Sequence, residues 1–463
     1  MNFLAHAMFL SIDKLYLALY ICHRIYNFCH RSMMIVGKTT NNIFESIRSM
    51  VHSGEFKSGD LLPPLRELAQ HLDVNRNTVA AAYKKLVDAG IAVSEGRKGT
   101  SIREKTHTLT REGTPPGLAL LDLSGGNPSS LLLPNLQLAF QHIAYTPRLY
   151  GAVSLSADIE KFARNWMNND IQVPFELNVT NGAVDAIERV LSSYLIAGDK
   201  VAVEDPCFLG SINTLHTNRY TAVGIPIDEH GLCIDTLSQQ LKNGIQALII
   251  TPRAHNPTGY GLSKTRADQV RQLLSLYPHV LIIIDDHFSL LSTHNYHHIV
   301  PLESKHWALI RSLSKCFGPD IRLAIVASDH ETSSKLQQRL NSGTNWVSHI
   351  LQDLAVYLLQ SEAISESLEQ AKNIYKQRRE KLIHALQAKG LRVSNQHDGL
   401  NVWVQLNNES TPVVMALARQ GWLVRAGEIF GLKQASYGLR ITVSELNDEV
   451  IDSLAATLSQ SIE

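Results

Sequence analysis

The chain has 463 residues, of which 44% are hydrophobic and 19% charged, a composition that excludes an intrinsically disordered protein and suits about three structural units. Lys and Arg together equal Asp and Glu at 43 each, so any nucleic-acid-binding surface must be local to one segment. The five cysteines form no CxxC and no metal-ligand spacing, which favours reduced thiols in a cytoplasmic protein without a metal site.

Residues 1–33 are apolar and aromatic but match no targeting segment. The charge-free run 15–22 is shorter than the ~20 apolar residues that span a bilayer, and Asp13 and Lys14 interrupt it. The basic residues follow the run, which is the wrong side for a secretory signal. Two interpretations stay open: an amphipathic anchor, or an extension that precedes the true start at Met33 or Met34 and is not part of the native chain. We favour the second and expect no membrane partner.

From residue 34 the pattern predicts a compact helical domain that ends near residue 103. Asn42–Ser53 places apolar residues on one helical face, and Gly54 ends the helix. The pair Pro63-Pro64 opens a second helix, LRELAQHL, because proline is tolerated in a first turn. The polar turn DVNRNT follows, with Asn75 as the expected N-cap of a third helix. Two short helices joined in this way have the pattern of a helix-turn-helix reader.

A hairpin with a basic tip is expected directly after these helices, in IAVSEGRKGTSI. From Val74 to Lys105 the chain carries seven Lys or Arg against three Asp or Glu, a local net charge of plus four. Such a charge cluster is the electrostatic footprint of nucleic-acid binding, although an ordinary solvated helix face gives the same count.

The segment LLPPLRELAQHLDVNRNTVAAAYKKLVDAG resembles the winged helix-turn-helix of GntR-family transcription regulators, departing mainly in Pro64, where serine is usual. The resemblance covers about residues 35–103. It implies that double-stranded DNA is a partner, with phosphates supplying most of the affinity and base edges the choice of site. The residues expected to approach DNA are Arg66, Arg76, Asn77, Thr78, Arg97, Lys98 and Gly99.

Residues 104–118 have no apolar period and read as a linker, after which residues 119–463 alternate apolar strands with helical stretches. The expected strands are Lys200–Val203, Ala247–Thr251, Val280–Asp286 and Trp307–Arg311. Such alternation predicts an α/β domain with a mainly parallel sheet, whose ligands gather at the carboxyl ends of the strands. Toward the C-terminus, NVWVQL and LRITV predict the strands of a smaller α+β subdomain.

The stretch SLSKCFGPDIR carries the strongest chemical signal. A lysine beside a core favours a nucleophilic amine, and Lys315 is placed to form an imine. Asp285, at the tip of VLIIIDD, suits a pyridinium nitrogen, while Ser312 and Arg322 suit a phosphate. These are the requirements of pyridoxal 5′-phosphate (PLP).

Three further patches, each commonplace alone, occur in the right order for the same cofactor. TNGAV starts a helix at which the N–H groups of Ala183 and Val184 could hold a phosphate. EDPCF offers Phe208 for stacking on a pyridine ring, and HNPTG offers the Asn256 amide for a ring hydroxyl.

From about residue 120 onward the chain resembles fold-type I aminotransferases, and the GntR fusion resembles the MocR subfamily. The resemblance implies Lys315 as the Schiff-base lysine, Arg440 in GLRITVS as the carboxylate-binding arginine, and Tyr150 as a contact to the neighbouring subunit's phosphate. Two departures stand out: the usual glutamine after the glycine turn is absent, and His287 replaces the tyrosine that donates to the ring oxygen. The second weakens any expectation of efficient turnover.

The sequence therefore predicts a cytoplasmic, PLP-dependent, DNA-binding transcription regulator that senses PLP or an amine or amino-acid adduct of it. Family resemblance implies a head-to-tail homodimer and makes control of vitamin B6 supply plausible. Two alternatives stay open: an active aminotransferase with an accessory DNA-binding domain, and a DNA-binding protein whose large domain is only a dimerisation scaffold.

Overall fold

The computed structural model describes residues 34–94, 96, 99–103, 112–113, 120–143, 146–432 and 436–462. The extension 1–33, the wing-tip residues Arg97 and Lys98, and most of the linker expected at 104–118 lie outside these ranges. The described residues divide into two compact units, one up to Arg103 and one from Glu112 on. Within the described ranges, no helix is both long enough and apolar enough to cross a membrane.

The first unit packs three helices against a two-stranded hairpin. The helices are α2 (Thr40–Ser53), α3 (Leu65–Leu72) and α4 (Arg76–Asp88), and the antiparallel strands are β1 (Ala92–Ser94) and β2 (Thr100–Ile102). Their buried residues form one cluster, to which α2 contributes Ile43, Phe44, Ile47 and Met50. The helical face and the hairpin expected from the sequence are both confirmed.

The ends of these helices follow from local side-chain chemistry. The Asn75 side chain accepts a hydrogen bond from the Asn77 backbone N–H at 2.8 Å and caps α4, as predicted. Thr39 caps α2 in the same way at 3.2 Å. Gly54 ends α2 at φ 83°, in a left-handed conformation that glycine adopts without steric cost. Local contacts thus fix where α4 begins and where α2 begins and ends.

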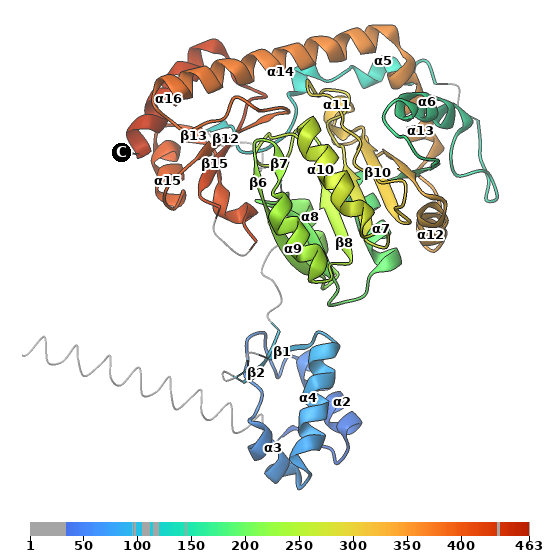
Figure 1. The fold of residues 1–463 in the computed structure, drawn as a ribbon, viewed down its shortest axis with the longest axis vertical. Coiled ribbons are helices and arrows are strands. Elements are labelled where there is room, and N and C mark those ends of the chain that lie inside the picture. The colour runs from blue at the N-terminus through green and yellow to red at the C-terminus, as the bar shows by residue number, and fades with distance from the viewer. Residues whose placement is uncertain are drawn as a thin grey trace, which may run out of the picture. The chain divides into compact units, whose positions relative to one another are not determined.

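The second unit is built on an eight-stranded sheet in the order β4-β11-β10-β9-β8-β5-β6-β7 (Figure 1). The strands from β10 through β6 run parallel, whereas β11, β4 and β7 pair antiparallel at the two ends. Their bounds are β4 Glu176–Thr180, β5 Lys200–Asp205, β6 Thr221–Asp228, β7 Gly231–Leu232, β8 Ala247–Ile250, β9 Leu281–Asp285, β10 Trp307–Ser312 and β11 Ala324–Ser328. The predicted mainly parallel sheet is confirmed.

Helices cover both faces of this sheet. One face packs against α6 (Ala157–Asn168), α9 (Ile234–Lys242), α10 (Lys264–Ser275) and α13 (His349–Gln360). The other packs against α7 (Ala183–Tyr194), α8 (Leu209–Thr217) and α12 (His330–Asn341). Along β9, Ile282 and Ile284 point to the first face and Leu281 and Ile283 to the second. The strand is thus apolar without interruption because both of its faces are buried.

The remaining chain forms the smaller subdomain expected at the C-terminus. The strands β12 (Asn401–Gln405), β15 (Gly438–Thr442) and β14 (Arg425–Ala426) form an antiparallel sheet. The helices α14 (Glu362–Ala388), α15 (Thr411–Arg419) and α16 (Asp448–Ile462) share its hydrophobic cluster, and in Figure 1 α14 runs across both subdomains. Short elements complete the unit: α5 (Leu136–Phe140), α11 (Ser314–Phe317), and the paired strands β3 (Leu121–Asp122) and β13 (Trp422–Leu423).

Candidate functional site

The candidate site lies where the parallel strands end. The strand β9 ends at Asp285, and β10 ends at Ser312 and leads through one residue into α11, which carries Lys315. Since neighbouring parallel strands end at the same edge of a sheet, these side chains meet there. The Asn256 loop follows β8 at that same edge.

The Lys315 amine is enclosed among polar partners rather than solvated. Its Nζ donates a hydrogen bond to the Gly126 carbonyl oxygen at 2.6 Å. Burial lowers the pKa of Lys315 to about 8; Arg440 acts in the same direction, while the carboxylates of Glu112 and Asp285 oppose it. A lysine with this pKa is partly neutral near pH 8, the form in which its amine is a nucleophile.

Asp285 presents a buried carboxylate oxygen that lacks a donor. The residue is only 5% exposed, and among the described residues none donates a hydrogen bond to its Oδ1. His287 Nδ1 lies 3.5 Å from that oxygen, outside hydrogen-bond geometry, and it too lacks a described partner. A buried acceptor left open in this way is costly unless a ligand supplies the donor. A protonated pyridine nitrogen is such a donor.

An anion cradle forms around the N-terminus of α7. Arg322 donates to the Asn181 carbonyl oxygen at 3.0 Å and to the Ser314 hydroxyl at 3.4 Å, and the Ser314 backbone N–H donates to the Ser312 hydroxyl at 3.3 Å. Gly182, at φ 95°, precedes Ala183 and Val184, the first two residues of α7. A helix N-terminus beside a guanidinium and two hydroxyls suits a phosphate.

Arg440 lies fully buried on β15 and is held by a carboxylate. Its two terminal nitrogens donate at 2.8 Å each to the two carboxylate oxygens of Glu112, and one of them also donates to Asn256 Oδ1 at 2.8 Å. The Asn256 amide in turn donates to Glu112 Oε1 at 3.2 Å. The structure thus brings Arg440, Asn256 and Lys315 together around Glu112.

A buried acid and imidazole lie beneath this site. Burial raises the pKa of Glu204 to about 8, with Asp285 adding to the shift against two hydrogen bonds from the Thr251 N–H. His255 Nε2 lies 3.3 Å from Glu204 Oε2, and burial lowers the pKa of His255 to about 3. At neutral pH the Glu204 carboxyl group therefore keeps its proton and the His255 imidazole is neutral, so the pair carries no net positive charge.

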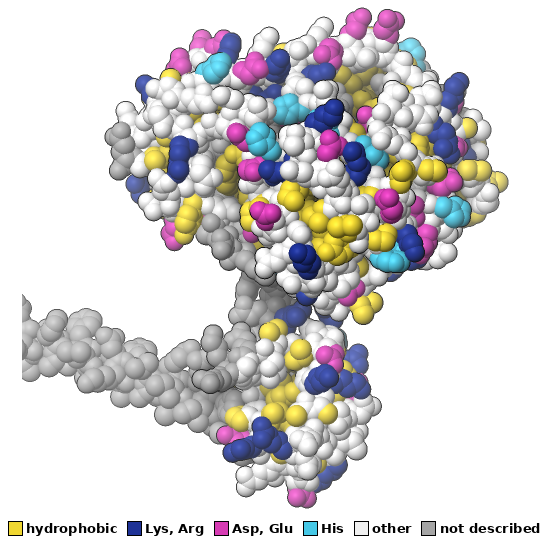
Figure 2. Space-filling model, viewed as in Figure 1, with side chains coloured by type: hydrophobic (Ala, Val, Ile, Leu, Met, Phe, Trp, Pro, Cys, Tyr) yellow, Lys and Arg dark blue, Asp and Glu magenta, His cyan; other side chains and the backbone are white. Residues whose placement is uncertain are grey.

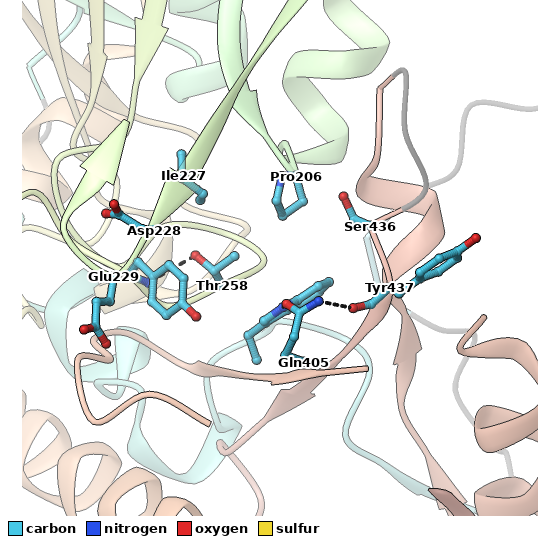
Figure 3. Close-up of a pocket in the computed structure, with 10 residues that line it drawn as sticks. Pro206, Ile227, Asp228, Glu229, Thr258, Gln405, Ser436 and Tyr437 are labelled. Carbon is cyan, nitrogen blue, oxygen red and sulfur yellow. Dashed lines mark hydrogen bonds between the residues drawn. The ribbon is translucent and has the colours of Figure 1, made fainter. Parts of the chain in front are cut away.

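A cavity of about 480 Å³ opens beside the Arg440 site (Figure 3). Thr258, two residues after Asn256, lines it, and so does Trp403, which pairs with Arg440 across β12 and β15. In Figure 3 the side chains of Pro206 and Thr258 face Gln405 across the cavity. Its wall mixes polar and apolar side chains, with Asp228 and Glu229 on one side. The cavity is large enough for a small organic ligand.

Two further expected cofactor residues are Phe208 and Tyr150. Phe208 caps α8, and its half-buried ring lies over Gly210, where a Cβ would come within 2.4 Å of it. Tyr150 is 92% exposed, with its ring 5.6 Å from that of Trp346. Tyr150 therefore stands outside this chain's own site, at the surface.

The DNA-binding candidates in the first unit are solvent-accessible. Arg66 on α3 and Arg76 and Asn77 at the start of α4 are exposed, as is Gly99, while Thr78 is half-buried. Figure 2 shows Lys and Arg side chains gathered in more than one place on the visible face of this unit. Arg97 and Lys98 lie outside the described residues.

Residues 39–102 match the bacterial regulatory proteins of the gntR family, and residues 119–458 match aminotransferase class I and II. "Vitamin B6 salvage pathway transcriptional repressor PtsJ" from Salmonella typhimurium is 48% identical over 429 residues, covering 93% of this chain and all of that protein. The chain belongs to the GntR regulators that carry a class I and II aminotransferase domain. Both predicted domains are confirmed, and so is the predicted resemblance to regulators that fuse them.

More distant relatives of this regulator include both a transcriptional regulator and aminotransferases. HTH-type transcriptional regulator TauR of Rhodobacter capsulatus is 23% identical, covering 85% of this chain and 90% of its own. 2-Aminoadipate transaminase of Thermus thermophilus is 26% identical, covering 67% and 79%. Kynurenine aminotransferase of Pyrococcus horikoshii, in complex with PMP, superposes with a TM-score of 0.67 at 18% identity over 74% of this chain and 91% of its own. These similarities confirm the fold-type I architecture.

The residues of the regulator's site fit PLP. The open Asp285 oxygen, the enclosed Lys315 amine and the Arg322 cradle match the ring nitrogen, aldehyde and phosphate of that molecule. Sequence reasoning missed three participants. Ser314 was overlooked although it stands between Ser312 and Lys315 in SLSK. In the sequence, Glu112 stands in a segment without apolar period, and EDPCF carries no local signal that marks Glu204.

Proposed function

We propose that the protein is a cytoplasmic transcription regulator that binds PLP in its aminotransferase domain and promoter DNA through its winged helix-turn-helix, and that it controls vitamin B6 salvage genes. The domain pair and the 48% identity to PtsJ support this proposal. The observation that carries it is the enclosed Lys315 amine near Asp285, whose Oδ1 is an open buried acceptor, in a chain that also carries a GntR domain.

Each residue has a definite task in this proposal. Lys315 would hold the PLP aldehyde with its neutral amine, and Asp285 would accept a hydrogen bond from the ring nitrogen. Arg322 with Ser312, Ser314 and the N–H groups of Ala183 and Val184 would hold the phosphate. PLP, when bound, supplies a carbonyl group and an electron-withdrawing ring. Phe208 would limit ring movement and Asn256 would contact the ring oxygen, with His287 standing where the family's tyrosine donates to that oxygen.

The same proposal includes a homodimer, head-to-tail as family resemblance implies. Large apolar side chains are exposed over residues 131–153: Leu131 is 87% exposed, Leu149 80%, Tyr150 92% and Val153 77%. Exposed apolar side chains in such number are typical of a surface that a second copy covers. Such a dimer would let Tyr150 reach the partner's phosphate cradle.

A second candidate, an active aminotransferase, is favoured by the intact Lys315, Asp285 and Arg440 set. Against it, His287 replaces the tyrosine of efficient enzymes, and a metabolic enzyme has no need of a GntR domain. Turnover of amino-acid donors on the order of 1 s⁻¹ or faster would select the enzyme, whereas a single slow half-reaction fits the regulator.

The deciding experiment measures DNA binding as PLP is varied. Fluorescence anisotropy with promoter DNA of vitamin B6 salvage genes from the same genome should give different affinities for the PLP-free and PLP-loaded protein. Pyridoxine serves as the control because it lacks both aldehyde and phosphate. Equal affinities in all three states would contradict PLP sensing, and a failure to bind any of these promoters tightly would contradict the assigned targets.

A further inference from the structure

Glu112 occupies the Arg440 site as a ligand would. Its two carboxylate oxygens each accept from Arg440 at 2.8 Å, and Asn256 adds a third hydrogen bond at 3.2 Å. The Arg440 side chain is fully buried, while that of Glu112 retains 24% exposure. Parallel bonds from one guanidinium to both oxygens are the geometry by which arginine selects a carboxylate. The site is therefore built for a carboxylate and is filled by one from the same chain.

The other contacts of Arg440 cannot balance its charge. They are the Ser124 carbonyl oxygen, the Asn256 amide oxygen and the face of Phe430, whose ring centre lies 5.0 Å away. All three are neutral, and a buried guanidinium without an anion is strongly unfavourable. An anion is thus strongly favoured at this position, and a carboxylate ligand must compete with Glu112 for it.

The backbone around Glu112 is fitted to this arrangement. Gly113 (φ 80°) lies against the glycine turn at Gly125 and Asn127, and a Cβ at Gly126 would come within 3.3 Å of Arg440. Burial alone would raise the pKa of Glu112, but Arg440, with Lys315 and Arg425, lowers it below its usual value. Glu112 is therefore charged at neutral pH, and its carboxylate competes with free carboxylates for Arg440.

In the sequence, Glu112 stands nine residues after Arg103, the last described residue of the DNA-binding unit. We infer that Glu112 is a built-in occupant of the carboxylate site, so that a carboxylate ligand enters only by displacing it. Any effect of this displacement on DNA binding rests on the proposed function, whereas the competition itself does not.

The competition can be measured on the full chain without PLP or DNA. Propionate is the probe, and propionamide, which has the same shape without the charge, is the control ligand. Isothermal titration at constant ionic strength should give Glu112→Gln a propionate Kd at least about tenfold lower than that of the wild type, because an occupied site lowers apparent affinity by its open fraction. Glu303→Gln changes the same charge at an exposed position and should bind propionate as the wild type does.

Equal propionate affinity in the wild type and Glu112→Gln would overturn the inference, as would equal gains for propionamide. A Glu112→Ala variant covers the case in which glutamine keeps the site closed. Because it leaves Arg440 without an anion, its thermal midpoint should rise with propionate more than that of the wild type. The absence of that difference would also count against the inference.

Trypsin reports whether Glu112 leaves Arg440. Cleavage after Arg111 needs the chain at Glu112 to enter the protease, so propionate should accelerate it in the wild type, whereas Glu112→Gln should be cut quickly without any probe. Propionate-independent, identical cleavage of both proteins would overturn the displacement. If competition and displacement hold while promoter affinity ignores PLP, the proposed function fails and this inference stands.

Discussion

Asp285 and Asp286 are consecutive residues at the carboxyl end of β9, yet their carboxylates meet opposite surroundings. Asp286 is fully buried and accepts hydrogen bonds from Arg253 at 2.7 and 2.8 Å and from Arg311 at 2.9 Å. Asp285 Oδ1, by contrast, receives none from any described residue. Successive side chains of a strand point to opposite sides, so one carboxylate supports the core and the next faces the site.

Replacing Asp286 with asparagine should lower the free energy of unfolding by about 3–5 kcal/mol, because the buried Arg253 guanidinium loses its carboxylate partner and Arg311 keeps only Asp170. Urea denaturation measures the loss. Asp268→Asn is the matched control, since Asp268 pairs with Arg271 at a half-exposed position and should cost less than about 1 kcal/mol. Equal losses would mean that the Asp286 network contributes no more than a surface ion pair.

Lys315→Ala should abolish covalent PLP binding. The wild type mixed with PLP should be yellow, and borohydride should fix the cofactor's mass on the tryptic peptide that contains Lys315. Lys305→Ala, an exposed lysine ten residues earlier, should keep the colour. A wild type that stays colourless after mixing, or mass fixed at another lysine, would contradict the assignment of Lys315.

The rate of PLP capture should rise with pH through about 8, because only the neutral Lys315 amine reacts and burial lowers the pKa of Lys315 to about 8. Stopped-flow absorbance measures the rate, with Nα-acetyl-lysine as the reference amine for the titration of PLP itself. The Glu112 carboxylate raises the pKa of Lys315, so Glu112→Gln should move the midpoint to lower pH. A midpoint near 10.5, the pKa of an ordinary lysine, would show that burial does not lower the pKa of Lys315.

Glu204 should make the protein less stable as pH rises. Its folded pKa of about 8 exceeds the ordinary 4.5, so between these values the folded chain holds a proton that the unfolded chain has released. The stabilising effect of that proton is complete below the unfolded pKa and is lost as pH rises through the folded pKa. Urea midpoints from about pH 5 to about pH 9 should fall in the wild type and fall less in Glu204→Gln. If the urea midpoints of the two proteins fell equally with pH, Glu204 would not be protonated in the folded chain at neutral pH.

DNA contacts should separate into two kinds. Arg76 begins α4, where a guanidinium can reach guanine O6 and N7, so Arg76→Ala should cost about 1–3 kcal/mol and blunt discrimination at one operator position. Lys98→Ala should weaken all sequences alike and flatten the salt slope by about one. Binding isotherms at several salt concentrations test both changes. An unchanged specific-to-nonspecific ratio for Arg76→Ala would show that Arg76 reads no base.

The strands and the first unit were predictable because their signals are local. The apolar run that ends at Asp285, the Asn75 cap and the Gly54 terminus each depend on a few neighbouring residues, and each appears where the sequence placed it. The antiparallel strands β4 and β11 were not predicted, since strand pairing at a sheet end depends on residues about 150 positions apart.

Glu112 shows why part of the site could not be predicted from the sequence. A single carboxylate in a segment without apolar period has no local signature, and its partner Arg440 stands 328 residues later. The pKa of Glu204 was equally inaccessible, because burial under the site, not the residue type, keeps its proton bound. Residue type and spacing predicted the PLP-facing set, whereas the groups that tune or block that set became visible only in three dimensions.

A single substitution at Gly182 would disturb the anion cradle around Arg322. A Cβ at this position would lie 2.5 Å from an Arg322 nitrogen, at a backbone φ of 95° that side chains rarely adopt. Alanine differs from glycine by one base in the codon, so a single mutation could displace the phosphate-binding arginine while leaving the sheet and the GntR domain intact. Lineages that lost vitamin B6 sensing but kept promoter binding would then be recognisable by the residue at this one position.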